Sequence, residues 1–576
     1  MLITKTAFLR KNILTGAMEV IIYFPFNQED LKIVRSIPGR KFIVTAKSQG
    51  SKKYWTAPFN GRTIQILMQN GWGFDSTTEE YLKKVSLHVK QRNKENEGLL
   101  QLLPKELYPF QIEGVRQLMK WDGRALLADD MGLGKTVQSL MWLKLNNTKI
   151  PAVIITPASL KYNWERECQK WLRTDRISVL SGTTPTDIYN DIIIINYDIV
   201  QYWLKHLLSI SYQTIILDEC HYIKNAKAQR TKAVKALCKG TKHIIALSGT
   251  AIQNRPIELF NTLNILNPHV FPSRWNFAHK YCNAKHTGFG WDFSGASNME
   301  ELHSILKNHF MIRRKKQDVL KELPDKTYNY IPIEISNRKD YDCAKDEFIA
   351  FVTQNISDEL NETEISLQKE LGYVNIALNK EEIIQEKVSS ISKAETLVKI
   401  GYLQRLATEG IISQVKEWIY NFLENNEKLV LFATHTRFIT EIENEFKNIS
   451  VKIDGSTPVA RRQQIVDAFQ NNKKIKIFIG NIKAAGVGLT LTASSNVAFL
   501  EYPWSPGDLT QAMDRCHRIG QKNNVNVHYF IAKDTIVEEI LQLLEEKQKI
   551  IDNILDGKSQ DNENIVNELL RQYVRR

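Results

Sequence analysis

The sequence predicts an α/β protein with two lobes built on parallel sheets, a helical insertion between them and a small α+β domain at the N-terminus. The length of 576 residues exceeds what one hydrophobic core usually holds and suggests three or four domains. Apolar runs alternate with amphipathic stretches, which is typical of parallel sheets. These runs are Val153–Thr156, Ile192–Tyr197, Thr214–Leu217, His243–Leu247, Lys428–Ala433, Ile475–Gly480 and Asn496–Leu500. A charge-rich stretch with a mostly helical pattern, residues 336–395, separates the first four from the last three.

We therefore expect five segments along the chain. The first begins with an extended run, Ile21–Phe26, followed by a helix near Gln28–Ile37 and a second extended run, Lys53–Pro58. At the other end, the run from Thr535 has helical periodicity and should pack on the second lobe. In order, the segments are a basic N-terminal domain (1–98), a first lobe (99–330), a helical insertion (331–395), a second lobe (396–545) and a helical tail (546–576).

The charge of the chain favours a polyanionic partner. The net charge is +13, and residues 1–100 hold sixteen Lys and Arg against eight Asp and Glu, or +8. Nucleic acid would suit such a surface, although a basic face that is merely solvated remains an alternative.

The other bulk features point away from secreted and membrane proteins. Six widely spaced cysteines form no Cys-x-x-Cys pattern, so we expect neither a disulfide framework nor a zinc site. The first residues lack the apolar core of a secretory signal, and no apolar stretch approaches the length of a membrane span. We expect a soluble protein of the cytoplasm, either bacterial or that of a host cell if the source is viral.

The segment Asp129–Thr136, Asp-Asp-Met-Gly-Leu-Gly-Lys-Thr, opens a helical run that reaches Leu145. Its glycines allow backbone N–H groups to surround phosphate oxygens, while Lys135 can reach the β- and γ-phosphates and Thr136 can ligate Mg²⁺. The predicted nucleotide-binding residues are Asp130, Met131, Gly132, Leu133, Gly134, Lys135 and Thr136.

A second motif supplies carboxylates. The apolar run Thr214–Leu217 ends in Asp218 and Glu219. Asp218 would hold Mg²⁺ together with Thr136, and Glu219 would orient and deprotonate the attacking water. A glycine-rich turn beside an ordinary acidic strand end is the alternative, but the two motifs in this order favour hydrolysis of a nucleoside triphosphate.

These and further segments resemble the ordered motifs of superfamily 2 helicase-like ATPases of the Snf2 type, which implies that both lobes are RecA-like. Gln111, at the end of Leu107–Gln111, is similar to the Q-motif glutamine that reads adenine, and this implies ATP rather than GTP. The other similar segments are Thr156–Trp164 (motif Ia), Ile195–Asp198 (Ib), Leu247–Asn254 (III), Lys428–His435 (IV), Lys483–Thr490 (V) and Gln511–Gln521 (VI).

The resemblance also implies roles for individual residues. Arg515 and Arg518 are three positions apart, so on a helix both would face the γ-phosphoryl group. ATP and Mg²⁺ are the implied cofactors, and duplex, branched or fork DNA is the implied partner. The implied catalytic residues are Lys135, Asp218, Glu219, Gln511, Arg515 and Arg518; the implied DNA contacts are Ser159, Lys161, Asn196, Tyr197, Lys483, Gly486 and Trp504; the residues that couple the two sites are Ser248, Gly249 and Thr250.

Within the Snf2 type, the chain is most similar to the HARP (HepA-related protein) branch of annealing helicases. The residues that carry this resemblance are Leu127–Thr136, Tyr281–Lys285, Gly290–Asn298, Met311–Val319 and Glu501–Gly507. It implies an ATP-driven DNA translocase that anneals strands or remodels forks. A remodeller that displaces a DNA-bound protein such as RNA polymerase is the alternative.

Two departures from the family pattern and one ambiguity remain. Cys220 stands where Ser or Ala is usual, and Met513 stands where Glu is usual in this branch. The basic N-terminal segment resembles the HARP domain, but its aromatic residues can be interpreted in two ways. Tyr54, Trp55, Phe59 and Trp72 could stack on unpaired bases or form the core of the domain, and we favour core for both tryptophans.

Overall fold

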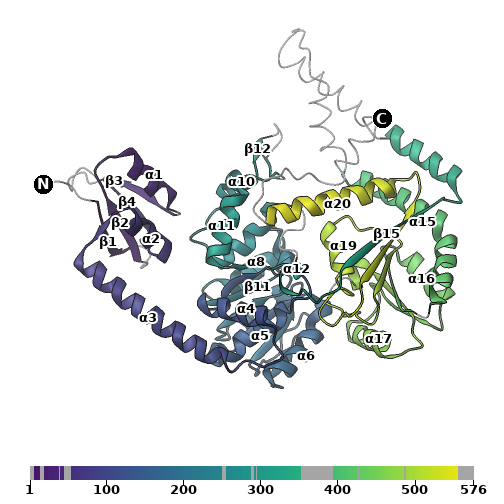
Figure 1. The fold of residues 1–576 in the computed structure, drawn as a ribbon, viewed down its shortest axis with the longest axis horizontal. Helices are drawn as coiled ribbons and strands as arrows, with labels where there is room; N and C mark the ends of the chain where they lie inside the picture. The colour runs from purple at the N-terminus through teal and green to yellow at the C-terminus, as the bar shows by residue number, and fades with distance from the viewer. Residues whose placement is uncertain are drawn as a thin grey trace, which may run out of the picture. The chain divides into compact units, whose positions relative to one another are not determined.

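The computed structural model describes residues 5–12, 18–37, 39–44, 53–249, 255–286, 291–293, 295–351, 393–425, 427–485 and 488–555 (Figure 1). Two compact units make up the chain. The first comprises Met1–Pro104 with Asn267–Pro272, and the second comprises Lys105–Leu266 with Ser273–Arg576.

The first unit contains a five-stranded sheet in the order β3-β4-β2-β1-β5, whose pairings are antiparallel except that of β1 with β5. The Asn27 side chain caps α1 by accepting a hydrogen bond from the Glu29 N–H at 2.9 Å. The predicted small α+β domain is confirmed. Its elements are β1 (Thr6–Lys11), β2 (Met18–Tyr23), α1 (Gln28–Ser36), β3 (Lys41–Val44), β4 (Lys53–Pro58), α2 (Gly61–Gln69), β5 (Gly73–Phe74) and α3 (Ser76–Leu100).

The aromatic residues of this unit divide between core and surface. Trp72 is buried in a core formed by Val20, Ile22, Val34 and Leu67, as expected. Trp55 is half-buried at the margin of the same core, and its ring lies 5.1 Å from that of the exposed Phe42.

The second unit begins with a seven-stranded parallel sheet in the order β14-β6-β11-β10-β7-β9-β8. The four central predicted strands are confirmed, and every residue of β7, β9, β10 and β11 is buried because helices cover both faces of the sheet. The strands are β6 (Arg124–Leu127), β7 (Ala152–Thr156), β8 (Ile177–Val179), β9 (Ile192–Asn196), β10 (Thr214–Leu217), β11 (His243–Leu247) and β14 (Met311–Ile312).

Helices and one short hairpin surround this first lobe. The helices are α4 (Pro109–Lys120), α5 (Lys135–Leu145), α6 (Lys161–Leu172), α7 (Val200–Leu208), α8 (Gln229–Cys238), α9 (Phe260–Leu266), α10 (Arg274–Tyr281), α11 (Met299–His309) and α12 (Lys316–Val319). The hairpin consists of β12 (Lys285–His286) and β13 (Trp291–Asp292), and short 3₁₀ turns lie at Asn147–Lys149, Ala158–Leu160, Cys220–Ile223 and Pro256–Leu259.

The second lobe holds a six-stranded parallel sheet in the order β15-β20-β19-β16-β18-β17. Its three predicted strands are confirmed within one or two residues. The strands are β15 (Lys326–Ile333), β16 (Leu429–Ala433), β17 (Ser450–Ile453), β18 (Ile477–Asn481), β19 (Asn496–Phe499) and β20 (Val525–Ala532); the helices are α15 (Lys393–Leu423), α16 (Thr436–Glu445), α17 (Val459–Asn471), α18 (Ile482–Ala485), α19 (Pro506–Met513) and α20 (Ile536–Leu555).

The predicted boundary at residue 330 lies inside a strand. All eight residues of β15 pair with β20, so this segment belongs to the second sheet. β15 is an edge strand with mostly exposed or half-buried side chains, and its sequence therefore lacks the apolar run that marked the central strands.

The predicted insertion and tail are described only in part. Residues 338–351 are helical, and α15 packs into the core of the second lobe with Leu403, Ala407 and Ile411, whereas residues 352–392 lie outside the described residues. The helix α20 packs on the same core, and residues 556–576 lie outside the described residues. No helix among the described residues is long and apolar enough to cross a membrane. All six cysteines carry free thiols.

Candidate functional site

The loop between β6 and α5 requires glycine at two positions. Gly132 has φ +83° and Gly134 has φ +74°, in the left-handed region that favours glycine. A Cβ atom at position 134 would lie 2.5 Å from Gln111 Nε2, and one at 132 would lie 2.7 Å from Arg518 Cβ. Gly134 also caps α5, so the loop brings its backbone to the start of that helix, where N–H groups favour an anion.

Lys135 is held by the loop itself. Its Nζ donates to the carbonyl oxygens of Asp129 and Asp130, at 2.7 and 3.1 Å. Burial lowers the pKa of Lys135, while the charges of Glu219 and Asp218 act in the opposite direction. The loop lysine and the two predicted catalytic carboxylates therefore share one site.

Asp218 is buried at the carboxyl end of β10. Its Oδ2 accepts hydrogen bonds from Thr156 Oγ1 at 2.9 Å and Trp164 Nε1 at 2.7 Å. Burial, followed by the charge of Glu219, raises the pKa of Asp218 to about 6. Both hydrogen bonds engage the same carboxylate oxygen, Oδ2.

Glu219 lies in a left-handed turn with φ +49°. Its Oε1 accepts a hydrogen bond from Gln511 Nε2 of the second lobe at 3.3 Å, and its Oε2 lies 3.3 Å from His221 Nδ1. Burial alone would raise the pKa of Glu219, but His221, Lys135 and Arg515 outweigh burial and lower it. The side chain is thus kept as a carboxylate, the form that can accept a proton from water.

The predicted coupling segment touches both motifs. Ser248 Oγ lies 3.5 Å from His221 Nδ1, and a Cβ at Gly249 would lie 2.4 Å from Met131 Cγ and 3.2 Å from Lys135 Nζ. Thr250 lies outside the described residues.

The prediction that Arg515 and Arg518 share a helix face is wrong, because α19 ends at Met513 and turns follow. The two side chains nevertheless converge. Arg515 Nη1 and Arg518 Nη1 both donate to the Leu489 carbonyl oxygen, at 3.4 and 3.1 Å. Burial and the charge of Arg518 lower the pKa of Arg515 to about 9.

One hydrogen-bond donor of Arg518, its Nε, has no acceptor among the described residues. This Nε is buried, and it lies 3.7 Å from the position that a Cβ at Gly132 would take. An anion held by the segment Asp129–Thr136, which we call the phosphate loop, would accept a hydrogen bond from this donor.

Asp514, the residue directly after α19, lies at the centre of a buried cluster of charges. Its Oδ1 binds Lys316 Nζ at 2.9 Å and Lys326 Nζ at 2.7 Å, and Lys316 Nζ also donates to the His517 carbonyl oxygen at 2.6 Å. The Lys316 backbone N–H donates to Asp130 Oδ2 at 3.0 Å. This buried cluster therefore connects the phosphate loop to the arginine segment, by which we mean residues 515–518. The sequence does not reveal this cluster, because Met311–Val319 contains Lys316 but carries no charge pattern that indicates its partner.

We expect Asp514→Asn to lower the free energy of unfolding by roughly 3–5 kcal/mol, because it leaves two buried lysines without their counter-charge. Lys316→Met should lower the free energy of unfolding by less, because Asp514 keeps its ion pair with Lys326. Denaturant unfolding of both variants measures the difference. Equal losses, or a loss below about 1 kcal/mol for Asp514→Asn, would contradict a charge-based role for the cluster.

Gln111 packs beneath the phosphate loop. Its Oε1 accepts a hydrogen bond from the Tyr108 N–H at 3.1 Å, and its Nε2 donates to the Leu133 carbonyl oxygen at 3.2 Å. Each amide atom retains one further hydrogen-bonding position, which is what adenine recognition would use. Behind the loop, Arg314 binds the buried Asp129 through Nε and Nη2 at 3.0 and 2.5 Å, a contact that no local sequence pattern indicates.

Three of the predicted DNA contacts have buried side chains, so their role in DNA binding stays a prediction. Lys161 Nζ donates to the Leu180 carbonyl oxygen at 2.7 Å, and Tyr197 donates its hydroxyl to the Asp218 carbonyl oxygen at 2.7 Å. Asn196 is buried at the end of β9. Ser159 is half-buried in a 3₁₀ turn, and Gly486 lies outside the described residues.

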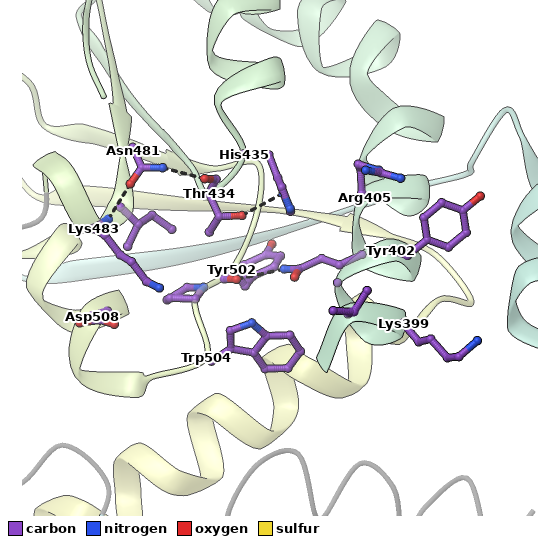
Figure 2. Close-up of a pocket in the computed structure, with 15 residues that line it drawn as sticks. Lys399, Tyr402, Arg405, Thr434, His435, Asn481, Lys483, Tyr502, Trp504 and Asp508 are labelled. Carbon is purple, nitrogen blue, oxygen red and sulfur yellow. Dashed lines mark hydrogen bonds between the residues drawn. The ribbon is translucent and has the colours of Figure 1, made fainter. Parts of the chain in front are cut away.

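Two other predicted contacts, Lys483 and Trp504, line one cavity of about 690 Å³ in the second lobe (Figure 2). It opens where β16 and β18 end, and α15 forms its other side. Several cationic or aromatic side chains meet there with one acid, Asp508. The cationic and aromatic ones are Lys399, Tyr402, Arg405, His435, Lys483, Tyr502 and Trp504.

In this cavity, His435 pairs with a fully buried carboxylate. His435 Nδ1 lies 2.5 Å from Glu501 Oε1, while Glu501 Oε2 accepts hydrogen bonds from the N–H groups of Thr434 and His435 at 2.8 and 2.7 Å. The hydrogen bond to Glu501 raises the pKa of His435, despite burial and the charge of Arg405, which lower it.

This pair should make stability depend on pH. Because the folded-state pKa of His435 is raised, its stabilisation is complete below the unfolded pKa of about 6.5 and is lost as the pH rises through the folded pKa. We expect the difference in unfolding midpoint between the wild type and His435→Gln to be largest at acidic pH and to shrink as the pH rises. A difference that grows with pH would contradict the ion pair.

The sequence is similar to known proteins over most of its length. Residues 110–387 match the SNF2-related domain, and residues 413–520 match the Helicase conserved C-terminal domain. The chain is 31% identical over 558 residues to the Caenorhabditis elegans "SWI/SNF-related matrix-associated actin-dependent regulator of chromatin subfamily A-like protein 1 homolog", covering 93% of this chain and 74% of that protein.

It is also 32% identical over 500 residues to the human "DNA annealing helicase and endonuclease ZRANB3", covering 83% of this chain and 43% of that protein. The chain thus spans less than half the length of this relative. The solved "Sulfolobus solfataricus SWI2/SNF2 ATPase core in complex with dsDNA" is 26% identical, covering 82% of this chain and 96% of that one, with a TM-score of 0.35.

Proposed function

Because this chain belongs to the Snf2 family of helicase-like ATPases, we propose that it binds ATP and Mg²⁺ between its two lobes and hydrolyses the ATP when DNA is bound. The observation that carries the proposal is the contact from Gln511 Nε2 to Glu219 Oε1, because it brings the arginine segment of the second lobe to the hydrolytic carboxylate of the first. ATP would be the ligand that both lobes share.

Each residue of the site then has a distinct task. Lys135 and the loop N–H groups bind the β- and γ-phosphates, and Arg515 and Arg518 neutralise charge on the transferring γ-phosphoryl group. Thr136 and Asp218 would hold Mg²⁺, which neutralises charge on the phosphates when it is bound. Glu219 orients water and accepts its proton.

We further propose that the chain translocates on DNA and anneals strands or remodels branched substrates. The cationic cavity with Lys483 and Trp504 supports a grip on the phosphate backbone, which would be salt-dependent and nearly independent of sequence. The human relative's name, which calls it a DNA annealing helicase, supports the choice of substrate. We assign residues 1–98 to recognition of the branched substrate.

The test is the rate of ATP hydrolysis with matched single-stranded, duplex and forked DNA at fixed low salt, for the full chain and for a chain lacking residues 1–98. We expect forked DNA to stimulate ATP hydrolysis most strongly, and we expect the truncated chain to lose this preference. Absence of stimulation by any DNA would contradict DNA-dependent hydrolysis. Equal stimulation by plain duplex would favour a remodeller whose target is set by a protein partner.

A further inference from the structure

A cluster of aromatic rings lies on the surface of the first lobe and contains no residue of the ATP site or of the second-lobe cavity. It joins α10 to the β12–β13 hairpin. Figure 1 shows α10 and β12 close together. The ring centroids of Trp275 and Trp291 are 4.7 Å apart, and the His279 ring lies 4.4 Å from Trp275 and 4.7 Å from Trp291. His286, opposite Trp291 in the hairpin, lies 5.2 Å from it. We call these four residues the Trp275–Trp291 cluster.

The fold does not bury this cluster. The inner face of α10 packs through Phe277 and Tyr281, which are 3% and 4% exposed, whereas Trp275 and Trp291 are 47% and 41% exposed. Two large indoles in contact with each other and half open to water indicate a binding surface rather than a core.

Other residues of the same segment account for its structure. Ser297 Oγ and Asn298 Nδ2 donate to the Lys280 carbonyl oxygen at 3.0 and 2.7 Å, and Ser297 Oγ accepts from the Asn283 N–H at 3.0 Å. These bonds fasten the chain after the hairpin to the end of α10. The indoles take part in none of these hydrogen bonds, and their rings stay half exposed.

The charge around the cluster suits a polyanion. Arg274 and Lys285 are exposed, and the Arg274 guanidinium lies over the Phe293 ring at 5.6 Å. Lys280 is paired with Glu301 at 2.6 Å, and Asp292 is the acidic residue of the hairpin. Aromatic faces beside cationic side chains are the combination that binds single-stranded nucleic acid, because each base can stack while the phosphates meet the cations.

We propose that the Trp275–Trp291 cluster is a stacking site for unpaired nucleobases, and that it engages the single-stranded part of a branched DNA. This inference rests on the proposed function and specifies which feature of the substrate the first lobe recognises. A protein partner could use the same exposed indoles, and the experiment below distinguishes the two.

The experiment uses the full chain and a labelled oligothymidine, a fork with single-stranded arms and a blunt duplex. The variants are Trp275→Ala, Trp291→Ala and Trp291→Phe, with Tyr189→Ala as a control at an 80% exposed aromatic of the same lobe. Fluorescence anisotropy gives each affinity, and duplex-stimulated ATP hydrolysis shows whether the motor is intact. Unfolding midpoints check that the variants are folded.

Each alanine variant should weaken binding of oligothymidine and fork by roughly 5- to 100-fold, while duplex affinity and duplex-stimulated hydrolysis stay near wild type. Trp291→Phe should retain most of the affinity because it keeps an aromatic face. Unchanged single-strand affinity, or an equal loss on single strand and duplex, would overturn the stacking site and leave the surface to a protein partner. If the wild-type chain hydrolyses no ATP with any DNA, the proposed function is refuted. The affinities of the wild type and its variants for oligothymidine would still test the stacking site.

Discussion

Glu219→Gln is expected to lower kcat for ATP hydrolysis by about 10²- to 10⁴-fold, the range for loss of a general base. The amide has nearly the same shape as the carboxylate but cannot accept the proton of water. In the wild type, His221, Lys135 and Arg515 keep Glu219 ionised despite its burial. Because Lys135 and the loop glycines are unchanged, ATP should still bind.

Two further variants make the measurement specific. Lys135→Ala should abolish hydrolysis and also weaken ATP binding, since the lysine itself would contact the phosphates. Cys220→Ser, at the buried neighbour of Glu219, should keep near-normal turnover because the change is small. ATP affinity and single-turnover hydrolysis are measured for all three. Normal turnover of Glu219→Gln would place the base elsewhere.

Local patterns made much of this protein predictable. The strands of the two sheet centres are continuous apolar runs, and their burial on both faces leaves little choice of conformation. The phosphate loop is equally local, because the two left-handed glycines, Gly132 and Gly134, directly precede the helix that begins at Lys135. The geometry brings this loop together with Asp218 and Glu219, as the motif order implied.

The differences between expectation and structure arise from contacts between residues far apart in the chain. Arg515 and Arg518 leave the expected helix because Asp514 turns toward Lys316 and Lys326, almost two hundred residues earlier. Lys161 and Tyr197 looked like surface contacts, but each finds a buried carbonyl partner that its own motif does not reveal. Only the folded chain shows which polar side chains of a motif point inward.

Arg518→Ala should lower DNA-stimulated kcat by about 10³- to 10⁵-fold, the effect of removing an arginine that stabilises the transferring phosphoryl group. The reason lies in its buried Nε, which has no hydrogen-bond partner among the described residues and lies beside Gly132 of the phosphate loop. A γ-phosphate held by that loop would supply the missing acceptor, and charge that develops in the transition state would strengthen the bond.

Arg518 gives a cleaner test than Arg515. Arg515 is only 3% exposed and donates to the Gln511 and Leu489 carbonyl oxygens, so Arg515→Ala should lower stability as well as rate. Arg518→Lys keeps the charge without the planar fork and should recover little activity. Arg437→Ala, at an exposed second-lobe arginine paired with Glu409, is the matched control and should hydrolyse ATP normally. If Arg518→Ala instead kept its kcat and lost only ATP affinity, Arg518 would bind the ground state and the transition state equally. Arg515 would then be the arginine that stabilises the transferring phosphoryl group.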